Sequence, residues 1–258
     1  MPELPEVETL RRSLMPWVVG KIVSKIEIYN PVVIESHNPE DFFGLRGCMI
    51  TDIKRRGKYL LFEIDRQKKK SQTAAVSDKL IMVAHMRMTG KLLYDSEIRT
   101  VQKHEHVKFI FDDNSQLAFE DVRRFGRLWL VSWNNLDSVS GLNSLALEPL
   151  DDAFTVDYLE EKFKRKQKST VKGALLDQRV VAGLGNIYVD EVLFAASVHP
   201  QRQIGTLSHE ENVKLVKAMK EILNSAIENR GTTFRDYVDA NNEKGDMQNF
   251  LKVFQREG

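Results

Sequence analysis

The stretch that decides the fold of this chain runs from Asp177 to Glu191 and reads DQRVVAGLGNIYVDE. Its glycines, Gly183 and Gly185, match part of a dinucleotide-binding loop. The third glycine of that loop is missing, however, and a predicted helix precedes the pair where the loop needs a strand. Two glycines also let backbone amides approach a phosphate closely. Asn186 is then predicted as the N-cap of a helix whose amides and dipole favour an anion.

Helical periodicity surrounds this stretch on both sides. Apolar residues at helical spacing predict helices over about 155–163 and 170–178, and another from about 186. Ser208 and Glu211 form a capping box that opens a helix, and Gly231 closes it. A basic patch lies upstream; its cations suit phosphate, although a solvated helix face has the same composition. The basic patch consists of Lys162, Lys164, Arg165, Lys166, Lys168 and Lys172.

The first half of the chain has a different pattern. A helix is predicted over about 4–15, with Pro16 and Gly20 at its exit. Between Lys21 and Trp133, apolar runs and alternating residues predict a series of strands separated by turn signals. Strands at this spacing indicate an antiparallel β-sandwich.

The domain organisation follows from the change of pattern. The lysine-rich stretch 68–73 is interpreted as a solvated hairpin loop. The composition becomes polar near 134–141, and the periodicity is helical afterwards. The sequence therefore predicts an α+β fold: an N-terminal helix and antiparallel β-sandwich over residues 1–134, then a helical domain over residues 135–258.

Composition narrows the class of protein. The chain has 258 residues and a net charge of +1, and it has no apolar run of the length, about 18 residues, that spans a membrane. Glu3, Glu6 and Glu8 occupy positions where a signal peptide needs a cationic and then an apolar stretch. The one cysteine, Cys48, excludes an intramolecular disulfide and a cysteine-rich zinc site within these residues. We expect a cytoplasmic protein.

The N-terminus carries a candidate nucleophile. Removal of Met1 would leave Pro2 with a free secondary amine, and an α-amino group loses its proton closer to neutral pH than a lysine does. Such an amine attacks the aldehyde carbon of a sugar to give an iminium ion, an electron sink of the kind used in covalent catalysis. Glu3 can move a proton. Prolines near a helix start are also ordinary, so the assignment depends on further motifs.

Three further motifs lie near predicted strand ends. They read RRGKYL at 55–60, HMRMTG at 85–90 and DVRRFG at 121–126. With the N-terminal MPELPEVETLRR and with residues 177–191, they resemble the formamidopyrimidine-DNA glycosylase family, whose members are bifunctional glycosylases and AP lyases. The resemblance covers essentially the whole chain. It implies an enzyme of base excision repair that removes oxidised purines, with residues 177–191 as its helix–two-turn–helix motif.

The resemblance assigns catalytic residues. Pro2 would form the Schiff base with the sugar, Glu3 would move protons, and Lys58 would contact the DNA backbone and assist the elimination steps. The implied partner is double-stranded DNA that contains oxidised bases or abasic sites. A monomer bound at the nucleoid of a bacterium is expected.

The resemblance also assigns DNA contacts. An enzyme that acts on a base inside a duplex must extrude it, and protein side chains fill the gap. Met88 would act as a wedge, Arg123 would pair with the orphaned base, and Phe125 would stack into the duplex. His104 and His106 have a metal-like spacing but no third ligand nearby, and the resemblance makes His104 a DNA contact. The remaining implied contacts are His85, Lys168 and Asn186.

This chain departs from the family pattern in two places. Thr89 stands where the family often has a glutamate near the lesion pocket, which puts the base preference in doubt. In most members a four-cysteine zinc finger follows the residue that matches Gly258. We therefore expect no metal and no cofactor in this chain, and zinc only where a finger lies beyond residue 258. The polar stretch 230–248 resembles the family's loop over the extruded base.

Two alternatives stay open. An endonuclease VIII-like glycosylase for oxidised pyrimidines would share most of these features, but Leu4-Pro5 and the pair of Arg123 and Phe125 argue against it. A non-catalytic relative that binds damaged DNA is the other alternative. The presence of all three assigned catalytic residues argues against that one.

Overall fold

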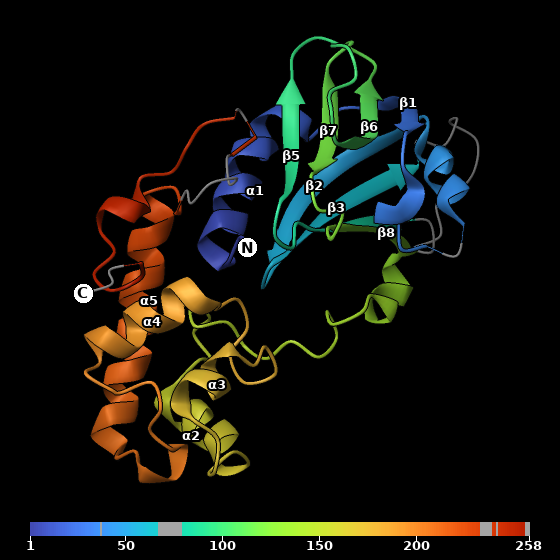
Figure 1. The fold of residues 1–258 in the computed structure, drawn as a ribbon. Helices are drawn as coiled ribbons and strands as arrows, with labels where there is room; N and C mark the ends of the chain where they lie inside the picture. The colour runs from blue at the N-terminus through green and yellow to red at the C-terminus, as the bar shows by residue number, and fades with distance from the viewer. Residues whose placement is uncertain (37, 67–78, 233–238, 241, 256–258) are drawn as a thin grey trace. The chain divides into compact units, whose positions relative to one another are not determined.

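The computed structural model of the chain, drawn in Figure 1, describes residues 1–36, 38–66, 79–232, 239–240 and 242–255. These residues form two units. The β unit consists of Met1–Pro2, Val7–Asn143 and the described part of Phe234–Lys244. The helical unit consists of Glu3–Glu6, Ser144–Thr233 and the described part of Gly245–Gly258. The predicted domains, 1–134 and 135–258, differ from these units in three places, because Glu3–Glu6 belongs to the helical unit, whereas residues 135–143 and the described part of Phe234–Lys244 belong to the β unit. Periodicity alone cannot reveal such membership.

Helix α1 spans Leu4–Val18 and places an apolar stripe in the core of the β unit. Val7, Leu10 and Leu14 are buried, as their helical spacing predicts. The predicted end near residue 15 is wrong, because the helix continues through Pro16 to Val18. Proline removes one helical hydrogen bond, but the fully buried side chain of Val18 anchors the last residues of the helix.

Two four-stranded antiparallel sheets make up the rest of the β unit (Figure 1), which confirms the predicted sandwich. The first sheet has the order β1-β6-β7-β5, with the strands Val23–Ile28, Glu105–Phe111, Gln116–Asp121 and Gly90–Asp95. The second has the order β2-β3-β4-β8, with the strands Cys48–Arg56, Tyr59–Arg66, Lys79–His85 and Arg127–Ser132. The stretch 68–73, predicted as a hairpin loop, lies outside the described residues.

The core of the β unit joins α1 to both sheets. Phe62, Phe109 and Phe119 are among its buried side chains, and burial of one such side chain contributes about 1.5–3 kcal/mol. The sequence did not predict β5 or most of β2. In both strands polar residues interrupt the apolar alternation, as in Lys91 and Asp95 of β5. Pairing with neighbouring strands, which is non-local, decides their structure.

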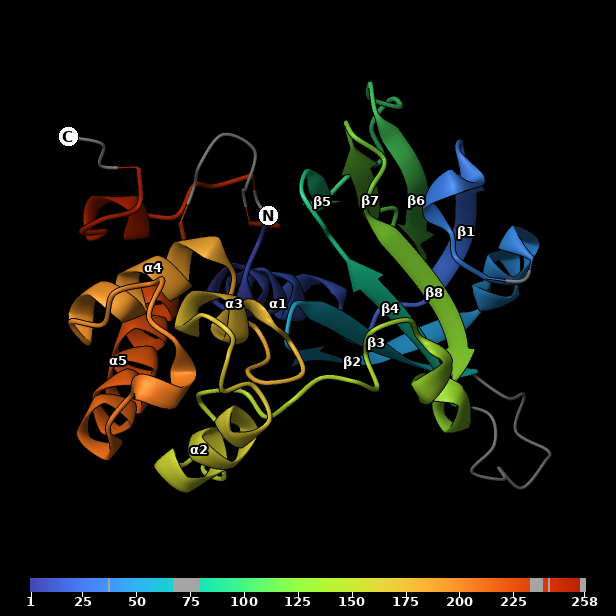
Figure 2. The same ribbon diagram turned by 60° about the horizontal axis from the view of Figure 1, so that its bottom comes forward.

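The helical unit contains four α-helices (Figure 2), of which α4 and α5 lie side by side. They are α2 (Val156–Lys164), α3 (Val171–Leu176), α4 (Asn186–Ala195) and α5 (His209–Glu228). The predicted capping box of Ser208 and Glu211 is present at the start of α5. Among the described residues, no helix is both long and apolar enough to cross a membrane. Short 3-10 helices occur at Pro31–Val33, Pro39–Leu45, Trp133–Ser138, Ile204–Thr206 and Met247–Asn249.

Candidate active site and nucleic-acid interface

The carboxylate of Glu3 is buried at the N-terminus of α4. Its Oε2 accepts a hydrogen bond from the N–H of Gly185 at 2.6 Å, and its Oε1 accepts one from Ile187 at 2.9 Å. A helix N-terminus favours an anion, and here the anion is a side chain of the protein itself. The N-cap is Gly185 and not Asn186, which is the exposed first residue of the helix, so the predicted cap is wrong.

Gly183 and Gly185 make room for the N-terminal residues. Gly183 has a φ of +95°, and a Cβ there would lie 2.6 Å from Cδ1 of Leu4. A Cβ at Gly185 would lie 2.5 Å from the carboxyl carbon of Glu3. The N–H of Leu4 also donates to the carbonyl of Gly183 at 3.0 Å. The glycines therefore admit the start of α1 in the place where the sequence predicted a phosphate.

Glu6 is the second buried carboxyl group of this region. Its Oε2 accepts from the N–H of Glu3 at 2.8 Å, and its Oε1 accepts from the N–H of Thr232 at 2.7 Å and from the hydroxyl of Tyr188 at 2.5 Å. Burial, and then the charge of Glu3, raises the pKa of Glu6 from 4.5 to about 7, although its hydrogen bonds act in the opposite direction. Glu3, Glu6, Tyr188 and Thr232 are together called the acid cluster.

Sequence reasoning missed Tyr188 and Thr232. Burial raises the pKa of Tyr188 well above 10, so its hydroxyl remains a donor toward Glu6. A tyrosine within an otherwise largely apolar helix is a signal, because a buried hydroxyl needs a hydrogen-bond partner. Thr232 donates its backbone N–H to Glu6, as any residue except proline could, and its Oγ1 lies 3.2 Å from the hydroxyl of Tyr188. The sequence around Thr232 gives no comparable signal.

Lys58 and His85 lie at strand ends of the second sheet. Lys58 follows Gly57, whose φ is +56°, in the two-residue turn between β2 and β3, and it is only 6% exposed. His85 ends β4, is buried, and accepts the N–H of Arg87 at its Nδ1 at 3.0 Å. Burial, and then the charges of Arg87 and Lys58, lower the pKa of His85 to about 3. The ring is therefore neutral, and its Nε2 carries the proton that can be donated.

Three residues that the sequence analysis assigned to DNA lie together on the surface of the β unit. Nη1 of Arg123 contacts Sδ of Met88 at 3.2 Å, and the guanidinium lies 4.7 Å from the ring centre of Phe125. Met88 is 44% exposed and Phe125 is 48% exposed. Large apolar side chains gathered on a surface mark a place where a partner binds. We call Met88, Arg123 and Phe125 the surface triad.

The buried carboxylate of Asp121 holds the backbone of the surface triad. Its Oδ1 accepts from the N–H of Arg123 at 3.1 Å and from the hydroxyl of Thr89. Its Oδ2 accepts from the N–H of Gly126 at 2.6 Å. Thr89 lies between β4 and β5, and Arg123 lies between β7 and β8. The Oγ1 of Thr89 also accepts from the N–H of Arg123 at 3.2 Å, which joins these two turns directly. A Cβ at Gly126 would lie 2.6 Å from the ring of Phe119, so a glycine is required there.

Two family models match this chain. The N-terminal domain of formamidopyrimidine-DNA glycosylase matches residues 1–128, and the H2TH domain of the same enzyme matches residues 145–238. The chain belongs to the formamidopyrimidine-DNA glycosylase family. The predicted family and the predicted fold are confirmed.

Relatives in this family are similar over nearly their whole length. The formamidopyrimidine-DNA glycosylase of Moorella thermoacetica is 42% identical, and the match covers 100% of this chain and 90% of the relative. The Lactococcus lactis enzyme in complex with DNA containing an abasic site is 35% identical with a TM-score of 0.86, covering 99% of this chain and 89% of that one. The same enzyme with DNA containing an oxidised pyrimidine has a TM-score of 0.84 at 35% identity, covering 97% and 86%.

The basic patch of this family member is partly neutralised. Three of its lysines form ion pairs at 2.7–2.8 Å: Lys164 with Glu161, Lys166 with Asp177, and Lys172 with Asp190. Lys168 is exposed in the turn that follows α2, and the described part of the chain contains no ion pair to it. Of the residues in the patch, Lys168 is therefore well placed to meet a phosphate from outside.

The two histidines with metal-like spacing have different surroundings. His106 is buried, and its Nε2 lies 2.7 Å from the carbonyl oxygen of Asp121. His104 is partly exposed and has a φ of +71°. The described residues contain no group of three or more His, Cys, Asp or Glu side chains that could hold a metal ion. They do not fit the zinc ion that the family implies, and no chemical step is assigned to it. Residues 233–238 and 241 of the predicted 230–248 loop lie outside the described residues.

Proposed function

We propose that this chain removes oxidised purines, such as 8-oxoguanine and formamidopyrimidines, from double-stranded DNA and then cleaves the strand at the abasic site. The family supports this proposal, as do relatives named for the activity and solved relatives in complex with DNA containing Fapy-dG or an abasic site. The observation that carries it is the buried carboxylate of Glu3, the residue that follows Pro2. Amides at the N-terminus of α4 fix this carboxylate. Catalysis of proton transfer needs a group held in such a position.

Pro2 supplies the nucleophile once Met1 is removed. Its amine nitrogen forms a bond to C1′ of the damaged nucleotide while the bond from C1′ to the base breaks, and the base leaves with a proton. The C1′–O4′ bond then breaks to give an iminium ion, which makes the C2′ proton acidic. Loss of that proton expels the 3′ phosphate, and a second elimination expels the 5′ phosphate. In this proposal Glu3 and Lys58 move the protons.

The surface triad fills the gap that the extruded nucleotide leaves. Met88 and Phe125 present the apolar surface that such a gap needs, and Arg123 carries the donors that recognise the orphaned base. Asp121 and Thr89 hold the backbone of both turns, so little ordering is needed on binding.

Covalent trapping tests the proposal. Borohydride added during reaction with abasic DNA should reduce the iminium ion and leave a stable protein–DNA adduct, and mass spectrometry should place the link at Pro2. The control is the same chain with one extra residue before Pro2, which turns the amine into an amide and should abolish the adduct. Absence of an adduct from the chain with a free Pro2 amine would contradict the enzymatic function and favour a non-catalytic DNA-binding protein.

Oxidised pyrimidines are a second candidate substrate class. The Lactococcus lactis relative has been solved with DNA that contains an oxidised pyrimidine. Thr89, which stands where the family often has a glutamate, contacts Asp121 in this chain. The excision rate should be measured on two matched duplexes, one with an oxidised purine and one with an oxidised pyrimidine. The ratio of the two rates distinguishes the two substrate classes. Faster excision of the pyrimidine would replace the first proposal.

We also propose that residues 1–258 act as a monomer without a metal cofactor, on cytoplasmic DNA at the nucleoid. The lone Cys48 cannot build a four-cysteine site within these residues, and a relative named for the activity, that of Moorella thermoacetica, is bacterial. Excision in the presence of a chelator and the mass in solution, with and without a duplex, test both statements. Loss of excision in the chelator, or a dimeric mass, would contradict them.

A further inference from the structure

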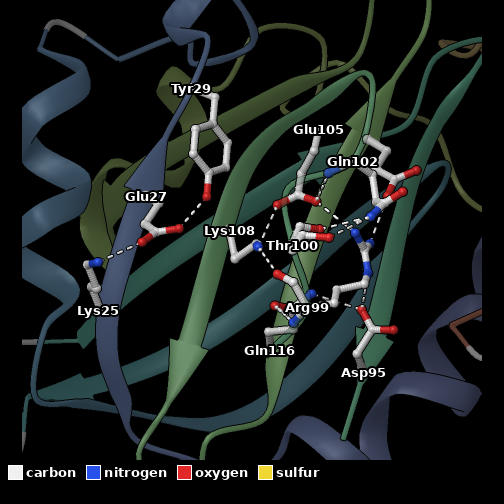
Figure 3. A network of polar contacts seen from close by, with 11 residues as sticks. Lys25, Glu27, Tyr29, Asp95, Arg99, Thr100, Gln102, Glu105, Lys108 and Gln116 are labelled. Atoms are coloured by element: carbon white, nitrogen blue, oxygen red, sulfur yellow. Dashed lines mark hydrogen bonds and ion pairs between the residues drawn. The ribbon is translucent and has the colours of Figure 1, made fainter. Parts of the chain in front are cut away.

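Arg99 lies in the segment 96–104, which joins β5 to β6, and carboxylates surround its guanidinium (Figure 3). Its Nε donates to Asp95 at 2.8 Å, its Nη1 to Glu105 at 2.9 Å, and its Nη2 to Glu120 at 2.8 Å. The segment itself is irregular. One side chain therefore joins it to three strands of the first sheet, β5, β6 and β7.

The backbone of Arg99 is held as well. Its N–H donates to Oε1 of Gln116 at 3.2 Å, and its carbonyl accepts from Nζ of Lys108 at 2.9 Å. Lys108 also pairs with Glu105 at 3.2 Å. Lys108, Glu105 and Gln116 are all buried, so these partners are themselves fixed by the sheet. Lys108 alternates with the core residues of β6 and thus lies on the opposite face of the sheet.

The same contacts reach the end of the segment, where Lys103 and His104 lie. Oε2 of Glu105 accepts from the N–H of Gln102 at 3.2 Å, and the carbonyl of His104 accepts from the N–H of Asp121 at 3.0 Å. His104 has a φ of +71°, which is uncommon outside glycine, in a turn closed by the hydrogen bond from the N–H of Glu105 to the carbonyl of Gln102 at 3.2 Å. The contacts of Glu105 and Asp121 hold this turn on both sides of the Lys103–His104 pair.

Apolar packing does not fix the segment. The apolar side chains of the segment, Ile98 and Val101, are about half exposed. A cavity of about 570 Å³ lies beside it, lined by Arg99, Gln102 and Lys103 together with both polar and apolar residues. Lys103 is exposed and His104 is partly exposed. The polar contacts of Arg99 are therefore the main restraint on the conformation of the segment.

We propose that Arg99 is a positioning residue that presets His104 for contact with DNA phosphates. The inference rests on the proposed function and on the DNA contact that the family resemblance implies for His104. A segment that is already ordered loses little conformational entropy when it binds. Removal of the restraint should therefore weaken DNA binding through His104, while the chemical step on bound DNA continues.

A double-mutant cycle tests this coupling. The probe is a duplex with a tetrahydrofuran abasic-site analogue, and the four proteins are the parent chain, Arg99→Gln, His104→Ala and the double variant. We expect Arg99→Gln to weaken binding about tenfold, which corresponds to about 1.4 kcal/mol. In the His104→Ala background the same change should weaken binding no more than about twofold, because the positioned residue is gone. For Arg99→Gln, the single-turnover rate at saturating lesion DNA should stay at the parent value.

Three matched variants separate positioning from charge and from stability. Arg99→Lys keeps the charge but cannot reach three carboxylates, so it should behave like Arg99→Gln. Lys25→Gln removes a cation that pairs with Glu27 on the same sheet (Figure 3), and it should leave binding unchanged. Glu120→Ala breaks one of the three contacts and should show a smaller but still His104-dependent loss, even if Arg99→Gln folds poorly.

Several outcomes would overturn the inference. They are an equal loss from Arg99→Gln with and without His104, a parent-like Arg99→Lys, or parent-like binding by His104→Ala. The binding cycle needs no catalysis, whereas borohydride trapping needs no change at Arg99. A failure of the proposed function and a failure of the positioning role are therefore observed in different experiments.

Discussion

The acid cluster of the helical unit and the surface triad of the β unit are built in opposite ways. In the acid cluster the functional oxygens of Glu3 and Glu6 are buried, and backbone amides donate to them directly. In the triad the side chains of Met88 and Phe125 are exposed, and the buried carboxylate of Asp121 holds only the backbone around them. Under the proposed function, the group that moves protons is fixed at its reacting atoms, whereas the groups that enter the duplex are fixed at the backbone.

This difference separates the expected effects of substitutions. A change in the acid cluster alters buried hydrogen bonds, so it should affect both the stability of the protein and its chemistry. A change of an exposed side chain in the triad leaves the folded protein nearly as stable and should affect only reactions that need a base extruded. The comparison would fail if a variant of the surface triad lost stability, or if a variant of the acid cluster affected only reactions that need a base extruded.

The largest effect is expected from Glu3→Gln. The amide NH₂ of glutamine would face backbone donors of α4 at Gly185 or Ile187, and the side chain could no longer exchange a proton. We expect the rate of base removal to fall by about 10²–10⁴-fold, the range for loss of an acid–base group. Single-turnover excision from a lesion duplex measures it. Binding of the abasic-site analogue should persist, and a loss of binding as large as the loss of rate would show that Glu3 is structural.

The next effect concerns the stability of the protein and its dependence on pH. The pKa of Glu6 is raised from 4.5 to about 7 in the folded state, so between these pH values the native protein binds more protons than the unfolded chain. The stabilisation by this carboxyl group is fully present below about pH 4.5 and is lost as the pH rises through 7. At about 1.4 kcal/mol per pH unit, the total is about 3 kcal/mol.

Glu6→Gln should remove this dependence. Denaturant unfolding between pH 4.5 and 7 should give a flatter stability curve for this variant than for the parent chain. Glu97→Gln, a change of an exposed glutamate in the β unit, is the control and should keep the parent slope. If Glu6→Gln also kept that slope, Glu6 would not be the group that titrates.

A smaller effect is expected from Phe125→Ala. Stacking of an aromatic side chain on a base contributes about 1–3 kcal/mol, so excision from a lesion duplex should fall by about 10–100-fold. Cleavage at a pre-formed abasic site should change little, because no base has to be extruded. Val122→Ala in the same turn, where Val122 is 58% exposed, is the matched control and should be nearly silent on both substrates. Equal losses on both substrates would make Phe125 structural.

Much of this architecture was predictable because it is local. Helical spacing placed α2 and α5, the pair of Ser208 and Glu211 marked a cap, and alternation marked the strand that contains Phe109. The motifs also located Arg123 near Met88, since their family pattern carries that information. Such features depend on residues close in sequence.

The remaining features depend on contacts between distant residues. Glu3 lies against an amide 182 residues away, and Thr232 reaches Glu6 over 226 residues. The two glycines near Asn186 were therefore assigned to a phosphate, although they accommodate the N-terminal residues. The network around Arg99 gave no sequence signal either, because charged residues near strand ends are usually solvated.

The smallest effect is expected in the basic patch, where a side chain acts on DNA without any burial. Lys168 is exposed and, within the described residues, has no ion pair, whereas Lys164 pairs with Glu161 at 2.7 Å. Each neutralised phosphate contributes about −0.9 to the slope of log K against log salt. Lys168→Ala should therefore reduce the steepness of that slope by about 0.9 for the abasic-site analogue. Lys164→Ala removes the same charge from the same patch and should change the slope less, because its partner already neutralises it. Equal slopes for the two variants would mean that only the total charge of the patch matters. The exposed side chain of Lys168 would then make no specific contact with a phosphate.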